Sequence, residues 1–153
     1  MYKRNTEELE KLLEQTHPSE IRNYMEENAD ELLSGDRPFM HYMNEKFREK
    51  GLQKQDVLLK ADISQGYGYK LLTEEKVTRQ RDVILRICYA AEFTIRETQV
   101  ALEVYHMETL YARDGRDALI MTCFHERPGS ILEVNELLQK NNMAPLRSSG
   151  VQD

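Results

Sequence analysis

The stretch GLQKQDVLLKADISQGYGYKLL, residues 51–72, decides the fold, because it has the length and the punctuation of two short helices joined by a tight turn. We predict the first helix from Gln53 to about Ala61 and the second from Gln65 to about Thr73. Apolar side chains recur at helical spacing and give both helices a face toward a core: Leu52, Val57, Leu58, Ala61, Leu71 and Leu72.

Three residues form the predicted turn between these helices. Asp62 begins the turn, Ile63 is expected to point inward, and Ser64 can cap the second helix through its hydroxyl. We expect the rest of the chain to be built onto this helix pair.

This pattern resembles the helix-turn-helix of the Cro/cI (XRE) family of DNA-binding repressors, in which the second helix enters the major groove. The resemblance extends over about residues 39–110 and is strongest at 51–72. The family usually has an alanine where Leu58 stands, a glycine at Asp62 and a branched apolar residue at Gly68. The first and third positions pack against each other in the family, so the larger Leu58 and the smaller Gly68 are expected to compensate in volume. Aspartate tolerates the left-handed conformation that the glycine normally supplies.

The resemblance implies two sets of DNA-contacting side chains. Gln65 matches a glutamine that contacts a base in related repressors, and such an amide can bind adenine with two hydrogen bonds. Tyr67 and Tyr69 on the same predicted helix complete the base-reading set. The side chains expected to contact phosphates are Lys54, Ser64, Lys70, Arg79 and Arg81.

The net charge of −6 argues against a generic nucleic-acid binder, but the charge is distributed unevenly. Residues 1–46 carry 6 basic and 11 acidic side chains, residues 47–86 carry 9 and 6, and residues 87–153 carry 6 and 10. The positive excess coincides with the helix-turn-helix, where a local patch can engage phosphates. The alternative is that such fluctuations are ordinary for solvated helical faces.

At 153 residues the chain is long enough for one well-packed domain with an appendage. Glycine and proline are sparse and no period-2 strand pattern occurs, which predicts an all-α protein.

The sequence has neither an apolar run of bilayer length nor the apolar segment of a signal peptide, so we expect a cytoplasmic protein with no membrane contact. Cys88 and Cys123 lack metal-binding spacing and are interpreted as small core residues.

We predict four segments. Residues 1–37 form an acidic N-terminal helical arm, with helices at 6–14 and 20–33, and end at the SGDRP punctuation of residues 34–38. Residues 38–112 form a repressor-like domain of five helices. Its first helix ends at Gly51, Thr78 caps the fourth and Thr94 caps the fifth in a Thr-x-x-Glu arrangement with Glu97.

The third segment, residues 113–146, repeats the pattern of the two helices that close the domain. Arg81-Asp82 and Cys88-Tyr89 recur 35 residues later as Arg116-Asp117 and Cys123-Phe124, and Thr94, Ile95 and Glu97 recur as Ser130, Ile131 and Glu133. We therefore predict a second helical hairpin, at 114–126 and 130–142, packed on the domain. The fourth segment, residues 147–153, is expected to be a flexible tail.

No catalytic constellation is present, and we predict neither an enzyme, a metal nor a cofactor. The four histidines lack ligand spacing, and GYGY lacks the Lys-Ser/Thr of a P-loop.

The favoured hypothesis is a transcriptional regulator that binds double-stranded DNA as a homodimer through the helix 65–73. The whole chain also resembles small bacterial helix-turn-helix proteins. The alternative is a non-catalytic adaptor that keeps the repressor-like fold without binding DNA. Such an adaptor would bind a protein through the acidic arm, residues 1–34, the tyrosine-rich surface or the repeated hairpins. Gly66 and Gly68 each weaken a helix by roughly 1 kcal/mol, and tyrosine is common at protein interfaces.

Overall fold

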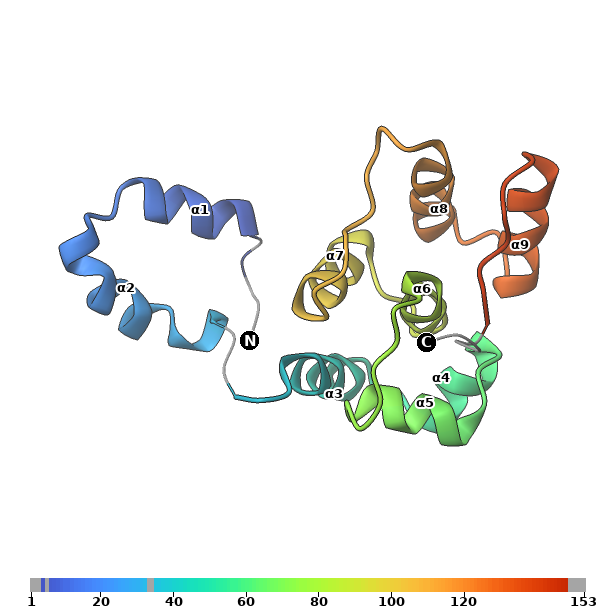
Figure 1. Ribbon diagram of the computed structural model, residues 1–153, viewed down its shortest axis with the longest axis horizontal. Helices are drawn as coiled ribbons and strands as arrows, with labels where there is room; N and C mark the ends of the chain where they lie inside the picture. Colours follow the sequence, from blue (N-terminus) through green and yellow to red (C-terminus); the bar gives the residue numbers. More distant parts are fainter. Residues whose placement is uncertain (1–3, 5, 33–34, 149–153) are drawn as a thin grey trace. The chain divides into compact units, whose positions relative to one another are not determined.

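A computed structural model describes residues 4, 6–32 and 35–148 of the chain. Every regular element within these residues is a helix, which confirms the all-α prediction (Figure 1). The chain divides into two compact units, Met1–Asp36 and Arg37–Asp153. In the described part of the chain no helix is both long enough and apolar enough to cross a bilayer.

The first unit consists of α1 (Thr6–Glu14), a 3-10 turn (Pro18–Glu20), α2 (Ile21–Glu27) and a second 3-10 turn (Ala29–Glu31). The helix predicted to reach residue 33 is therefore too long, because α2 ends at Glu27. The side-chain amide of Asn28 donates to the carbonyl of Tyr24 at 2.9 Å, and such local bonds compete with helix propagation. Residues 33 and 34, at the predicted helix end, lie outside the described residues.

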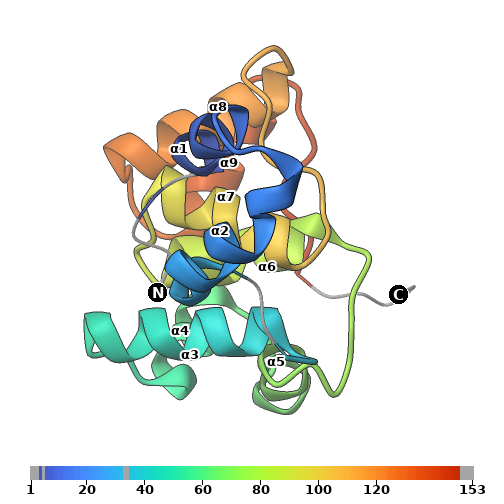
Figure 2. The ribbon, with the colours of Figure 1, turned by 90° about the vertical axis from the view of Figure 1, so that its left-hand side faces the viewer.

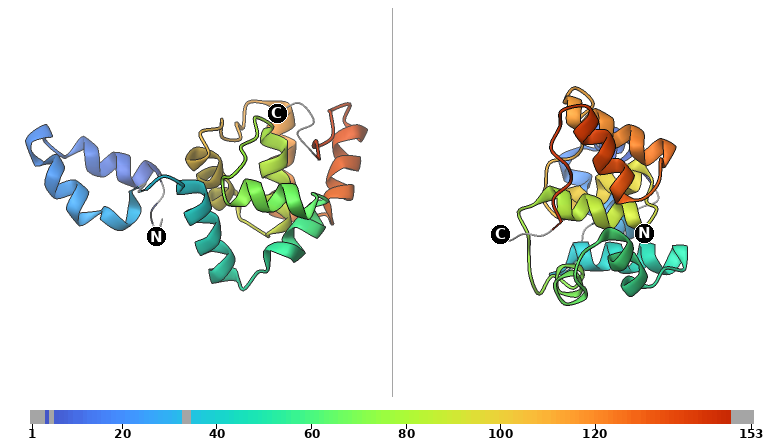
Figure 3. Two further views of the ribbon diagram at one scale, coloured as in Figure 1. Left: turned by 60° about the horizontal axis from the view of Figure 1, so that its bottom comes forward. Right: turned by 90° about the vertical axis from the view of Figure 1, so that its right-hand side faces the viewer.

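The second unit contains seven helices within its described residues: α3 (Pro38–Lys50), α4 (Lys54–Ala61), α5 (Gln65–Leu72), α6 (Arg81–Ala90), α7 (Ile95–Val104), α8 (Gly115–Glu126) and α9 (Ile131–Lys140). Helix α6 is the centre of the core, because every residue from Val83 to Ala90 is buried. Helices α4, α7 and α9 pack against it. Figures 2 and 3 show α3, α4 and α5 on one side of α6 and the α8–α9 hairpin on the other.

The helix boundaries follow local signals, with two exceptions. Gly51 ends α3 in the left-handed conformation, at φ 65°, and Thr94 forms the predicted capping box with Glu97. Helix α6, the fourth helix of the predicted domain, begins two residues later than expected. The Thr78 hydroxyl accepts a hydrogen bond from the backbone N–H of Gln80 at 2.9 Å and so supports a turn that precedes α6. Ser64 is the N-cap of α5 by position, but its side chain makes no capping hydrogen bond.

The two hairpins, α6–α7 and α8–α9, repeat in hydrogen bonding as well as in sequence. The Gln99 side chain bonds both the N–H and the carbonyl of Leu110 at 2.8 Å, and the Asn135 side chain accepts from the N–H of Leu146 at 2.8 Å. A capping box of Ser130 and Glu133 opens α9, as Thr94 and Glu97 open α7. Helix α8 packs against α7 and α9 packs against α6, so the two hairpins contact each other.

The repeated Arg-Asp pairs are exchanged between the hairpins. The Arg81 guanidinium donates to both carboxylate oxygens of Asp117, at 3.1 and 2.5 Å, and the Arg116 guanidinium donates to both oxygens of Asp82 at 3.0 Å. We call these four residues the hairpin junction. Because each arginine bonds the aspartate of the other hairpin, the junction holds the two repeats together with approximate two-fold symmetry.

Backbone groups complete this symmetry. Arg81 donates to the carbonyls of Glu108 and Thr109, which follow α7, and Arg116 donates to those of Ala144 and Pro145, which follow α9. The N–H of Arg147 donates to Asp82 at 3.1 Å, so this residue of the predicted flexible tail is held in place. Residues 149–153 of that tail lie outside the described residues.

Candidate functional site

Helices α4 and α5 are joined by the short turn of residues 62–64. Asp62 ends α4 in the left-handed conformation, at φ 56° and ψ 49°, a conformation that aspartate tolerates. The N–H of Ile63 donates to the carbonyl of Leu58 at 3.0 Å, and the Ile63 side chain is buried. The turn is therefore fixed by both a backbone hydrogen bond and core packing.

Leu58 and Gly68 face each other where α4 and α5 cross. Leu58 is completely buried, and a Cβ atom added to Gly68 would lie only 2.6 Å from its Cδ1 methyl and closer still to Cδ2. Cβ atoms in proteins essentially never approach other atoms this closely. The leucine therefore fills the space that a side chain at position 68 would need, which is the exchange of volume expected from the sequence.

Helix α5 leaves one side uncovered. Its exposed residues are Ser64 at the N-cap, Gly66, Tyr69 and Lys70, and Figure 3 (left) shows α5 at the front of the second unit with no described helix of that unit before it. Tyr69 keeps 40% of its surface exposed. Tyr67 is half-buried, and the Lys76 ammonium lies 5.7 Å from the centre of its ring. Of the two tyrosines in the base-reading set, Tyr69 is thus the more accessible.

Gln65 is positioned by the neighbouring helix. Its side-chain nitrogen donates to the carbonyl of Gln55, in the first turn of α4, at 3.0 Å. A glutamine amide has two N–H donors and an oxygen with two lone pairs, so this bond leaves most of its capacity for another partner. The bond restricts the rotamers of the side chain and holds it at the start of α5.

The five predicted phosphate contacts fall into two groups. Lys70, Arg79 and Ser64 are exposed, and Lys54 is half-buried at the start of α4. Arg81 is different, because its guanidinium already bonds Asp117 and two backbone carbonyls. A phosphate would have to compete with a carboxylate whose side chain is only 6% exposed.

A buried arginine, which was not among the predicted site residues, connects the end of α4 to the segment that follows α9. Arg86 is 5% exposed and donates to the carbonyl of Ala61, in the last residue of α4, at 3.0 Å and to that of Leu146 at 2.7 Å. Burial lowers the pKa of its guanidinium. Its Nε has no hydrogen-bond partner among the residues that the structure describes. The available signal was a charged residue inside the apolar run VILRICYAA.

The cysteines belong to the core. Both are free and buried, and burial raises the pKa of each thiol. Over residues 4, 6–32 and 35–148, no group of three or more His, Cys, Asp and Glu side chains is arranged to hold a metal ion. Comparison of the chain with protein-family models, with curated proteins and with solved structures finds no match.

Proposed function

We propose that this chain is a DNA-binding transcriptional regulator that reads the major groove with α5. In this proposal helices α3–α7 form a repressor-like domain of the Cro/cI type, and the α8–α9 hairpin buttresses it. The observation that carries the proposal is the α4–turn–α5 unit, in which the Leu58–Gly68 contact and the left-handed Asp62 accompany an uncovered outer side of α5. The local excess of basic residues, 9 against 6 over residues 47–86, supports the same assignment.

The residues divide between reading bases and holding phosphates. Gln65 and Tyr69 are the foremost base contacts, because glutamine suits the adenine edge and a tyrosine ring can contact the thymine methyl. Tyr67 is placed beside them as a supporting contact. The phosphate contacts that we retain are Lys54, Ser64, Lys70 and Arg79, since Arg81 is engaged in the hairpin junction.

A homodimer fits this proposal best. One helix of eight residues reaches few base pairs, and helix-turn-helix proteins gain affinity and specificity by placing two such helices on paired half-sites. The acidic first unit is expected to lower the affinity by repelling the duplex, and the contacts between cations and phosphates make the affinity fall as salt rises.

Fluorescence anisotropy with a labelled random duplex tests DNA binding. We expect micromolar or tighter association at low salt. The slope of log K against log salt should be about −0.9 for each phosphate neutralised, or roughly −3 for the three cations of one subunit. Failure to bind at low salt would overturn the proposal.

Two substitutions separate the roles once a preferred site has been selected. Gln65→Ala should reduce the preference for that site over random duplex, whereas Arg79→Ala should weaken binding to all sequences alike. Gln139→Ala and Arg113→Ala, at exposed positions outside the helix-turn-helix, are the matched controls. Equal effects of the Gln65 and Arg79 changes would refute the division of roles.

A protein-binding adaptor is the second candidate, and one observation favours it. The first unit buries no apolar side chain among its described residues, and its exposed apolar residues are Leu12, Leu13, Ile21 and Met25. A unit of this size cannot bury such a surface by itself. We therefore assign any protein partner to the arm, residues 1–34. Leu13→Glu combined with Met25→Glu should abolish capture of a partner by the full chain, and undiminished capture would exclude the arm.

A further inference from the structure

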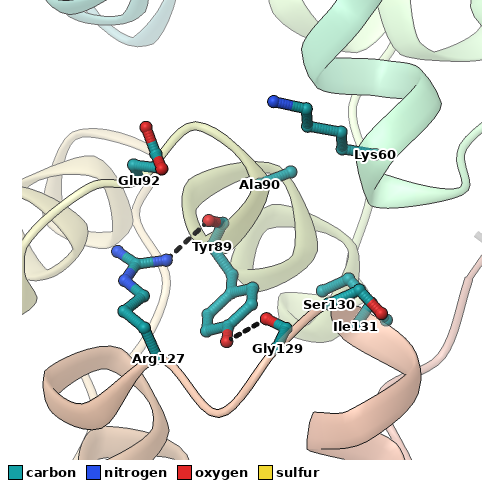
Figure 4. Close-up of a pocket in the computed structure, with 8 residues that line it drawn as sticks. All are labelled: Lys60, Tyr89, Ala90, Glu92, Arg127, Gly129, Ser130 and Ile131. Atoms are coloured by element: carbon teal, nitrogen blue, oxygen red, sulfur yellow. Dashed lines mark hydrogen bonds between the residues drawn. The ribbon is translucent and has the colours of Figure 1, made fainter.

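A pocket of about 390 Å³ opens in the second unit between three helices and the loop that joins α8 to α9 (Figure 4). Its wall comes from the end of α6, the loop between α8 and α9, the start of α9, and α4 through Lys60. Tyr89, Ala90 and Ile131 are each at least nine-tenths buried and supply apolar surface. This volume lies within the range of about 300–1,000 Å³ that is usual for small-molecule sites.

Arg127 is held rigidly at the edge of this pocket. Its Nη1 donates to the carbonyl of Tyr89 at 2.7 Å and its Nη2 donates to that of Phe93. The guanidinium also lies 4.6 Å from the ring centre of Tyr89 and 5.2 Å from that of Phe124. Because a guanidinium has five N–H groups, these two bonds fix the side chain and leave donors for a ligand.

Two further charged side chains line the pocket, and neither is committed to another group. Lys60 and Glu92 are both exposed, and neither forms an ion pair with any part of the chain that the structure describes. All three charged side chains line the pocket, and Figure 4 draws the Lys60 ammonium apart from the Arg127 guanidinium, with the Glu92 carboxylate above Arg127 in this view. Two cations and one anion leave the pocket with a net positive charge.

Glu133, near the start of α9, does not line the pocket but adds a negative charge beside Gly129 and Ser130. Glu133 already accepts the N–H of Ser130 at 2.8 Å in the capping box, and the Ser130 hydroxyl holds the pKa of that carboxyl below its usual range. Selectivity for an anion therefore rests on Lys60 and Arg127.

We propose that this pocket binds a small carboxylate that carries an apolar body. The carboxylate lies between Arg127 and Lys60, and the guanidinium matches its two oxygens in geometry. The apolar body covers Ala90 and Ile131. The occupant contacts α4 through Lys60 and the second hairpin through Arg127, so it bridges the helix-turn-helix and the repeat. This proposal is independent of DNA binding.

Phenylacetate is a suitable probe, and phenylacetamide is its neutral counterpart. Titration of the full ¹⁵N-labelled chain with phenylacetate should produce saturable amide shifts at Glu92, Gly129 and Ser130, with a dissociation constant in the millimolar range. Phenylacetamide should bind several-fold more weakly. The absence of saturable shifts, or equal affinity for the two compounds, would overturn the proposal.

Two charge-removing variants sharpen the test because they act in opposite directions. Lys60→Gln should weaken phenylacetate binding by about two- to five-fold, and Glu92→Gln should strengthen it by a similar factor. Both side chains are exposed, so neither change is expected to disturb folding. Arg113→Gln removes an exposed cation that does not line the pocket and should leave the affinity unchanged. Changes of the same sign in the Lys60 and Glu92 variants would contradict the assigned carboxylate position.

Discussion

Leu58 and Gly68 show how two unusual residues can form one ordinary contact. Each departs from the pattern of the Cro/cI family, yet the leucine methyls occupy the space beside the glycine. The resemblance to that family predicted this pairing, because the two matching positions pack against each other there. It could not reveal how closely they approach, which depends on the crossing of α4 and α5.

A double-mutant cycle measures this contact. Gly68→Ala alone should destabilise the chain by about 1–3 kcal/mol through overpacking, and Leu58→Ala alone by about 2–5 kcal/mol through the cavity it leaves. The double variant should lose less than the sum of the two, because the new methyl enters the cavity. Urea unfolding measures all three free energies. Strict additivity would mean that the two side chains do not share this space.

Glu97 makes the stability of the second unit depend on pH. Its carboxylate opposes Lys50 at 2.9 Å and Lys46 at 3.5 Å and accepts the N–H of Thr94. Burial by itself raises its pKa, but the bond from Thr94 and the two lysines together outweigh burial, so the pKa lies below its ordinary value of 4.5. A lowered pKa stabilises the fold above the unfolded value, and this contribution disappears as the pH falls through the folded value.

Glu97→Gln should therefore reduce stability at neutral pH and flatten the loss of stability below about pH 4.5. Urea unfolding across an acid pH series measures the effect, with the exposed Glu136→Gln as the control. An unchanged acid profile in the Glu97 variant would contradict the assigned role.

At the scale of the elements, helix limits were predictable where one residue or a short motif decides them. Gly51 ends α3, and the capping boxes at Thr94 and Ser130 open α7 and α9. The predicted limits were wrong where a polar side chain forms a hydrogen bond with the backbone of a residue close to it in sequence. Asn28 stops α2 and Thr78 supports a turn before α6.

Contacts between elements were harder to predict than the elements themselves. The repeat revealed two equivalent hairpins, but it could not show that Arg81 bonds Asp117 while Arg116 bonds Asp82. From the sequence alone, each arginine could equally have paired with the aspartate of its own hairpin or with that of the other hairpin. Lys60 and Arg127 were equally inconspicuous in the sequence, because they are 67 positions apart and meet only around a pocket.

The hairpin junction should be unequal in strength despite its symmetry. The Asp117 side chain is 6% exposed and that of Asp82 is 12% exposed, so losing the arginine leaves a more deeply buried charge at Asp117. Arg81→Met should cost about 2 kcal/mol or more, and Arg116→Met less. Urea unfolding compares them, with the exposed Arg113→Met as a control that should change stability little. A negligible effect of Arg81→Met would show that the junction does not stabilise the fold.

At the scale of the whole molecule, the second unit contains the α4–turn–α5 pair and two equivalent hairpins, and α6 of the first hairpin packs against α4. Arg86 joins the end of α4 to the segment that follows α9, so the far end of the chain supports the turn before α5. The first unit has an excess of acidic side chains, whereas the region of residues 47–86 has an excess of basic ones. The DNA binding that we propose therefore depends on a local surface rather than on the net charge.

The most direct test of that central claim maps DNA onto the folded chain. In an NMR titration of the full chain with a short duplex at low salt, we expect the largest amide shifts from Ser64 to Lys70, with smaller shifts at Lys54 and Arg79. Raising the salt concentration should reverse them. No shifts at low salt, or shifts confined to the first unit, would contradict the claim that α5 reads DNA.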